Sequence, residues 1–172
     1  MSDAASLIPP GHPAAPEYRA AERPAPIDAV ADAMVERLKQ LLPGRVMVEH
    51  FPDKPDEFDF EGYDAAVLVL WDGSDFDQAG MSGEQGTREE LRMAVALLVR
   101  ELRGATGAYR LKHEIQQALH GGSFGGTTGL RPIKADLEKQ AENVFQYLLV
   151  FAGAIRAVPT RPSGVALPST RR

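Results

Sequence analysis

The pentapeptide Gly121-Gly122-Ser123-Phe124-Gly125 matches the pattern G-x-S-x-G, in which a strained turn exposes a nucleophilic serine, and His120 directly precedes it. That chemistry needs a strand before the serine, a helix after it, and an acid and then a histidine later in the chain. Here a predicted helix comes first, a Gly/Thr loop over residues 125–129 follows, and no histidine comes after His120. A flexible loop is the favoured interpretation, and a small hydrolase remains a remote alternative.

The histidines at positions 113 and 120 share one face of that predicted helix but stand two turns apart, which at 1.5 Å per residue is roughly 10 Å. One metal ion cannot bridge that distance. His113-Glu114 does not continue into the zinc motif H-E-x-x-H, because Gln117 occupies the place of the second histidine. We interpret both as surface histidines.

Asp72, Asp75 and Asp77 crowd a predicted loop with Gly73 and could collect a hard cation, but they do not form the calcium-loop pattern with its closing Glu. A solvated turn is the favoured interpretation. The glycine pairs within residues 121–126 follow a helix C-terminus, the wrong end of the dipole for phosphate, and bring no lysine. No catalytic, metal or cofactor residue is therefore predicted.

Hydrophobic spacing predicts the elements. A helix is expected over residues 27–42, stopped by Pro43-Gly44, and a second over 107–120, with Thr106 as its N-cap and Gly121 beyond its end.

Strands are expected at residues 45–51 and 63–71, and the second is apolar at consecutive positions, as a central strand is. Alternation over 133–138, a polar turn at 140–143 and the apolar run 144–155 predict a hairpin.

Segment 87–102 fits two structures. Leu91, Val95 and Leu98 follow helical spacing, yet Leu91, Met93 and Val95 also alternate with less apolar residues. Local propensity slightly favours the helix.

The run 144–155 is apolar on both faces, with Phe145, Tyr147, Leu149 and Phe151 on one and Val144, Leu148, Val150 and Ala152 on the other. One face is expected to pack on a helix, leaving the other for a sheet partner or a neighbouring subunit. Burial wholly inside one subunit is the open alternative.

Composition narrows the class of protein. With 172 residues, 44% hydrophobic and 25% charged, the chain suits one folded domain. The absence of cysteine excludes disulfides, thiolate zinc sites and cysteine nucleophiles. The longest apolar runs, such as 65–71, are far shorter than the roughly 20 residues of a membrane helix. Residues 49–77 hold ten acidic residues and one lysine, a balance of −9, so nucleic-acid recognition is not expected.

The chain divides by composition into three parts. Residues 1–26 are dense in Pro and Ala and predict a flexible arm without a secretion signal, so cytoplasmic synthesis is expected. Residues 27–158 form the predicted domain, and residues 159–172 a short basic flexible tail.

Several local phrases, by their order and spacing, resemble the tail-completion (tail-terminator) family of Mu-like contractile-tailed phages over roughly residues 27–158. The phrases are Leu41-Leu42-Pro43-Gly44, Val48-Glu49-His50-Phe51-Pro52-Asp53-Lys54-Pro55, Ala66-Val67-Leu68-Val69, Gly107-Ala108-Tyr109 and Phe145-Gln146-Tyr147.

The resemblance implies an α+β fold with a mixed, mostly antiparallel sheet of about four to five strands, an N-terminal helix and a second helix packed on it. It also implies that residues 89–102 form a strand paired with residues 63–71.

The function implied is that of a structural, non-enzymatic virion protein, a ring of six subunits that caps the tail tube at the tail–neck junction. The implied partners are further copies of itself, the tube protein, the sheath as a further candidate, and a neck or head-completion protein, with assembly in the host cytoplasm. Another head–tail connector or neck adaptor is the alternative.

We expect the interface at the acidic stretch, the last strand and the glycine loop. The candidate residues are Asp53, Asp56, Glu57, Asp59, Glu61, Leu148, Val150, Gly122, Ser123 and Phe124.

Overall fold

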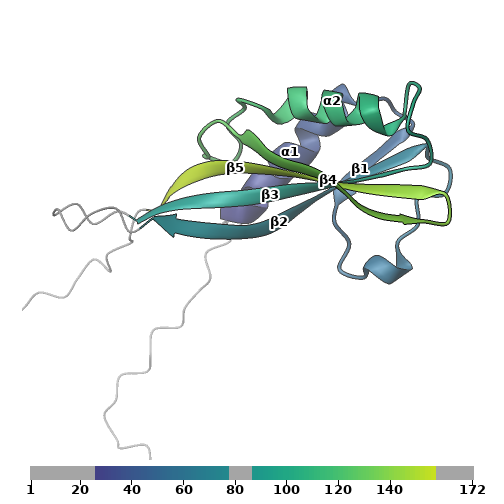
Figure 1. Ribbon diagram of the computed structural model, residues 1–172. Coiled ribbons are helices and arrows are strands. Elements are labelled where there is room, and N and C mark those ends of the chain that lie inside the picture. The colour runs from purple at the N-terminus through teal and green to yellow at the C-terminus, as the bar shows by residue number, and fades with distance from the viewer. Residues whose placement is uncertain (1–25, 78–86, 158–172) are drawn as a thin grey trace, which may run out of the picture.

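Two helices cover one face of a five-stranded mixed sheet (Figure 1). The computed structural model describes residues 26–77 and 87–157. The predicted α+β class is confirmed, including both helices and the mostly antiparallel sheet. The predicted basic tail and nearly all of the predicted arm lie outside the described residues.

Helix α1 (Pro26–Leu41) forms because its apolar residues fall on one stripe. Val30, Met34 and Leu38, four residues apart, are completely buried. The amide of Leu42 closes the last helical hydrogen bond on Leu38 at 2.9 Å, and Pro43 then stops the helix because it cannot donate one. The predicted extent of 27–42 is correct to within one residue at each end.

The sheet has the strand order β1-β2-β3-β5-β4. Its strands are β1 (Val46–His50), β2 (Ala65–Asp77), β3 (Thr87–Val99), β4 (Arg131–Ala141) and β5 (Val144–Ala157). Only β1 and β2 pair in parallel, and the connection between them carries the short 3-10 helix η1 (Pro55–Glu57). Strands β1 and β4 are therefore the two edges of the sheet.

Segment 87–102, which fitted both a helix and a strand, is strand β3. It pairs antiparallel with β2 on one side and β5 on the other, so Val95 faces Val69 and Leu149 across the sheet. This confirms the pairing that the family resemblance implied. Pairing on both sides outweighs the slight helical propensity, because each strand residue gains cross-strand packing there.

The second helix, α2 (Ala108–Leu119), ends as predicted, with Gly121 beyond it at a φ of 77°. Its predicted start is wrong in one respect: the N-cap is Gly107, with no side-chain cap. The Thr106 hydroxyl instead donates to Asp64 at 3.4 Å, because the turn before the helix faces the start of β2. The cap was misassigned since this contact is made only in the folded chain.

The hydrophobic core lies between the helices and one face of the sheet. It joins both helices to alternate residues of the three central strands, among them Val67, Val95 and Phe151. As predicted, one face of the last strand packs on the core, with Leu149 and Phe151 buried and Phe145 and Tyr147 packed against it. No described helix is long and apolar enough to cross a membrane.

Strands β4 and β5 form the predicted hairpin, although β4 runs on to Ala141 and the turn is only Glu142-Asn143. Both turn residues have positive φ, 49° and 64°. That pair of left-handed residues matches the right-handed twist of the strands on either side, and Asn tolerates it well.

Candidate functional site

The G-x-S-x-G loop has the geometry of a structural loop. It follows α2 and leads to β4, so the strand–turn–helix context of a nucleophilic serine does not occur here. Its two ends are tied together, because the Gly121 amide donates to Leu130 and the Leu130 amide to Gly122, both at 2.8 Å. Ser123 is exposed.

Phe124 folds back into the core, where it is only 9% exposed. The Thr127 hydroxyl donates to its carbonyl at 2.8 Å and accepts from its amide at 3.1 Å. A Cβ atom at the half-buried Gly122 would lie 2.5 Å from the Phe124 ring, so a side chain there would displace the ring from its place in the core. Of the three loop residues predicted to make an interface, Ser123 alone presents an exposed side chain.

Both histidines of α2 are confirmed as surface residues, since His113 and His120 are exposed. Within residues 26–77 and 87–157, no three His, Cys, Asp or Glu side chains are grouped closely enough to hold a metal ion.

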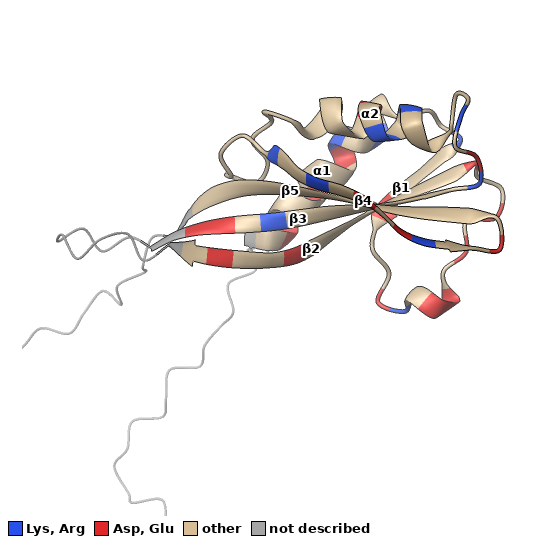
Figure 2. Ribbon diagram, viewed as in Figure 1, with Lys and Arg blue, Asp and Glu red and all other residues tan. Residues whose placement is uncertain are grey.

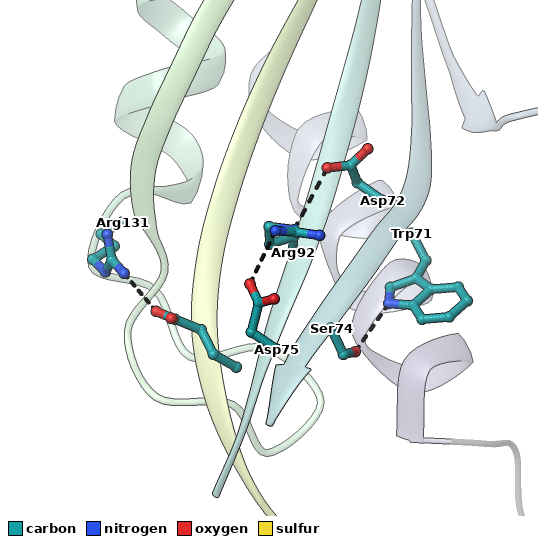
Figure 3. Close-up of polar contacts among 7 residues, drawn as sticks. Trp71, Asp72, Ser74, Asp75, Arg92 and Arg131 are labelled. Atoms are coloured by element: carbon teal, nitrogen blue, oxygen red, sulfur yellow. Dashed lines mark hydrogen bonds and ion pairs between the residues drawn. The ribbon is translucent and has the colours of Figure 1, made fainter. Parts of the chain in front are cut away.

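The aspartates predicted to lie on a solvated turn belong to strand β2, so that prediction is wrong. The strand continues six residues past Trp71 because β3 pairs with it along its full length, with a register shift between Trp71 and Gly73. On the sheet face away from the helices, Arg92 of β3 binds Asp75 at 2.9 Å and approaches Asp72 at 3.8 Å (Figure 3). Asp72 and Asp75 are therefore partners of an arginine.

The polar contacts continue across the same end of the sheet. Arg131 of β4 binds Glu90 of β3 at 2.5 Å, spanning β5 between them. On the helix side, the exposed Trp71 indole donates to Ser74 at 3.3 Å (Figure 3). Sequence reasoning found the two aspartates but missed Arg92, Glu90 and Arg131 as ion-pair residues, because only strand register brings these residues together.

The residues of the predicted acidic interface lie on the loop that carries η1, where Figure 2 shows several red stretches below the sheet. All five carboxylates predicted to make contacts there are exposed: Asp53, Asp56, Glu57, Asp59 and Glu61. Lys54, the one base, is bound to Glu57 at 3.0 Å. The loop thus presents a surplus of negative charge to solvent.

Two contacts at its base hold that loop in place. The Arg100 guanidinium stacks 4.2 Å from the centre of the Phe60 ring and donates to the Tyr63 carbonyl at 2.8 Å. Asp64 is half-buried and bound to Arg45 at 2.8 Å, so it anchors the loop and is not part of its exposed surface. A loop fixed at its base can present carboxylates in a defined arrangement.

The outer face of the last strand is less available than predicted. Val150 is 4% exposed, and Leu148 is half-buried. Val150 lies between Ala94 of β3 and Lys134 of β4, whose aliphatic stem shares the face. Most of this face is therefore covered within one subunit.

Lys134 sits in a row of charges along β4. It binds Asp136 at 2.8 Å and Glu138 at 3.5 Å. The hydrogen bond to Asp136, followed by the attraction of both carboxylates, raises the pKa of Lys134 above the ordinary value of 10.5. The Lys134 side chain is exposed, so the row orders the strand surface more than it stabilises the fold.

The fold and these surfaces define a small α+β protein whose charged loop and open sheet edges suit contact with other proteins. The chain belongs to the Gp37 protein family, whose model matches residues 34–169. Among solved structures it resembles a chain of the virion of a native gene transfer agent particle, at 18% identity and a TM-score of 0.51. The alignment covers 78% of this chain and 100% of that chain, which shows a shared fold.

No curated protein matches the chain. The family and the shared fold support the predicted resemblance to a phage tail-type family in general, but they do not single out the Mu-like phages.

Proposed function

We propose that this chain is a structural protein of a phage-type or gene-transfer-agent particle, and that a ring of about six copies caps the tail tube as its terminator. The observation that carries this proposal is the shared fold with a chain of a gene transfer agent virion, over the full length of that chain. Membership of the Gp37 family, together with the local phrases found in tail-completion proteins, supports the same role.

The proposed partners follow from this position. One side of the ring meets the tube protein, with the sheath as a further candidate, and the other meets a neck or head-completion protein. The exposed carboxylates of the loop around η1 are the proposed contact with one of these partners. The role is non-enzymatic, and Ser123 acts only as an exposed loop residue.

Deleting the gene from a cell that produces the particle tests the proposal. A terminator blocks further addition of tube subunits, so its loss should give tubes of abnormal and variable length. Loss of a neck adaptor, the alternative function, should give tails of normal length detached from heads. Wild-type chain supplied in trans should restore normal tails.

The hydrolase alternative is tested with Ser123→Ala in the same system. Because Ser123 is exposed, the substitution should leave folding intact. Full restoration of tails by the variant supports the structural role, whereas failure of a folded, stable variant would favour chemistry at the serine.

A further inference from the structure

The two edges of the sheet differ in charge. Strands β1 and β4 each leave one row of backbone N–H and C=O groups without a strand partner in the described chain. Strand β4 is exposed along almost its whole length, and Ile133 is 43% exposed. Three strands separate the edges, which at about 4.8 Å per step places them roughly 19 Å apart.

The groove beside β1 is acidic. It lies between α1 and β1, has a volume of about 530 Å³, and is lined by Asp32, Val35, Glu36, Lys39, Glu49 and His50. His50 binds Asp32 at 2.9 Å. Glu36 and Glu49 have no ion-pair partner among the described residues, so this edge keeps unneutralised negative charge.

The groove beside β4 is basic and has an apolar floor. It lies between α2 and β4, with a volume of about 230 Å³, and its lining includes Leu149, Phe151 and Ile133. Its charged lining residues are Lys112 and Lys134. Lys134 already binds two carboxylates of its own strand, whereas Lys112 has no ion-pair partner in the described part of the chain.

We infer that the β4 edge of one copy docks against the β1 edge of the next, with Lys112 and Lys134 facing Glu36 and Glu49. The occupant of each groove is a second copy of this chain, because the complementary charges lie on opposite edges of the same sheet. Edge-to-edge contact also gives the unpaired backbone groups partners. Contact between two different surfaces is heterologous, so it repeats from copy to copy and produces a ring where the rotation closes.

This inference rests on the proposed ring, and charge reversal tests it. One variant carries Glu36→Lys and Glu49→Lys, and the other Lys112→Glu and Lys134→Glu. Each alone places like charges together and should weaken self-association by about tenfold or more. Mixing the two restores the charge match at every contact, so the mixture should assemble again.

Glu101→Lys with Arg103→Glu is the matched control, since both residues are exposed and lie outside the two grooves. It should assemble like the wild type. If the wild type forms rings and both charge-reversal variants form them equally well, the edge contact is wrong, but the proposed ring still holds. A wild type that stays monomeric, both alone and on tail tubes, overturns the ring and the edge contact together.

Because Lys134→Glu adds repulsion beside Asp136 and Glu138 and so threatens folding, cysteine cross-linking provides an independent test. The chain has no cysteine of its own. Glu49→Cys and Ala135→Cys in one chain lie on opposite edges, beyond the roughly 7 Å between Cα atoms that a disulfide spans. Oxidation should therefore link different copies into a ladder that stops at the ring number. Ladders of equal yield from Glu101→Cys with Ala135→Cys would overturn the inference.

Discussion

The guanidinium group of Arg92 lies against the backbone of Gly73, so closely that a Cβ atom at position 73 would stand 3.1 Å from Nη2. Gly73 has a φ of 135° and follows the register shift that starts at Trp71. A residue without a side chain thus lets one arginine bind Asp75 and approach Asp72 on the same strand.

Gly73→Ala should therefore destabilise the fold by about 1–3 kcal/mol, because alanine is strained at that φ and Arg92 must move. Urea unfolding measures the loss. Gly44→Ala is the control, since its φ is not positive and nothing lies within 4 Å of its added Cβ; it should change stability by less than about 1 kcal/mol. Equal effects from the two variants would contradict the role given to Gly73.

Gly125→Ala should be more damaging than Gly126→Ala. Both glycines have positive φ, 54° and 88°, but only the Cβ at position 125 would meet the α1 backbone, 2.6 Å from the Val30 nitrogen. The helix backbone cannot move out of the way as a side chain can. The loop must therefore move away from α1, which weakens the packing of Phe124 in the core. We expect about 1–2 kcal/mol for Gly126→Ala and at least about 2 kcal/mol more for Gly125→Ala.

Both variants place alanine at a positive φ, but only Gly125→Ala meets α1. The difference between their unfolding free energies therefore measures the packing of the loop against α1. If Gly126→Ala costs as much as Gly125→Ala, the loop does not seal the core as described.

Lys134 should titrate above 10.5, because Asp136 and Glu138 favour its charged form. A pKa that is higher in the folded than in the unfolded chain adds stability below about pH 10.5, and that contribution is lost as pH rises through the folded value. NMR titration of the lysine Cε and Nζ resonances measures the pKa. Asp136→Asn should lower the pKa of Lys134. The control Glu101→Gln changes an exposed carboxylate outside this row of charges and should leave that pKa unchanged.

Replacing three loop carboxylates, by Asp56→Asn, Glu57→Gln and Asp59→Asn, should leave the fold intact within about 0.5 kcal/mol, because all three are exposed. Binding to purified tail tubes should weaken and become less sensitive to salt if the loop docks by charge.

The control removes the same charge elsewhere, with Asp28→Asn, Glu101→Gln and Glu142→Gln, all exposed. Tube binding and salt dependence that match between the two triple variants would leave the loop as a merely solubilising surface.

Local pattern determined much of the fold in advance. The four-residue spacing of Val30, Met34 and Leu38, close to the helical period, and the breaker Pro43 predicted α1. The alternation before Glu142-Asn143 predicted the hairpin. Such signals depend on residues that are close together in the sequence, so they can be identified from the sequence alone. The exposure of the five loop carboxylates and the two α2 histidines was predictable for the same reason, since charged and polar side chains seldom lose water without a partner.

Contacts between distant residues decided the rest. Whether segment 87–102 became a helix or strand β3 depended on β2 and β5 lying on either side, and the residues alone fitted both. Asp72 and Asp75 lie on a strand and not on the predicted turn, because pairing with β3 continues past Trp71 and β3 supplies Arg92 as their partner. Phe124 was predicted to lie at an interface but is a core residue, because Gly122 and Gly125 allow the loop to pack closely against Phe124 and α1. Register and burial arise from residues far apart in the chain, and only the folded structure brings those residues together.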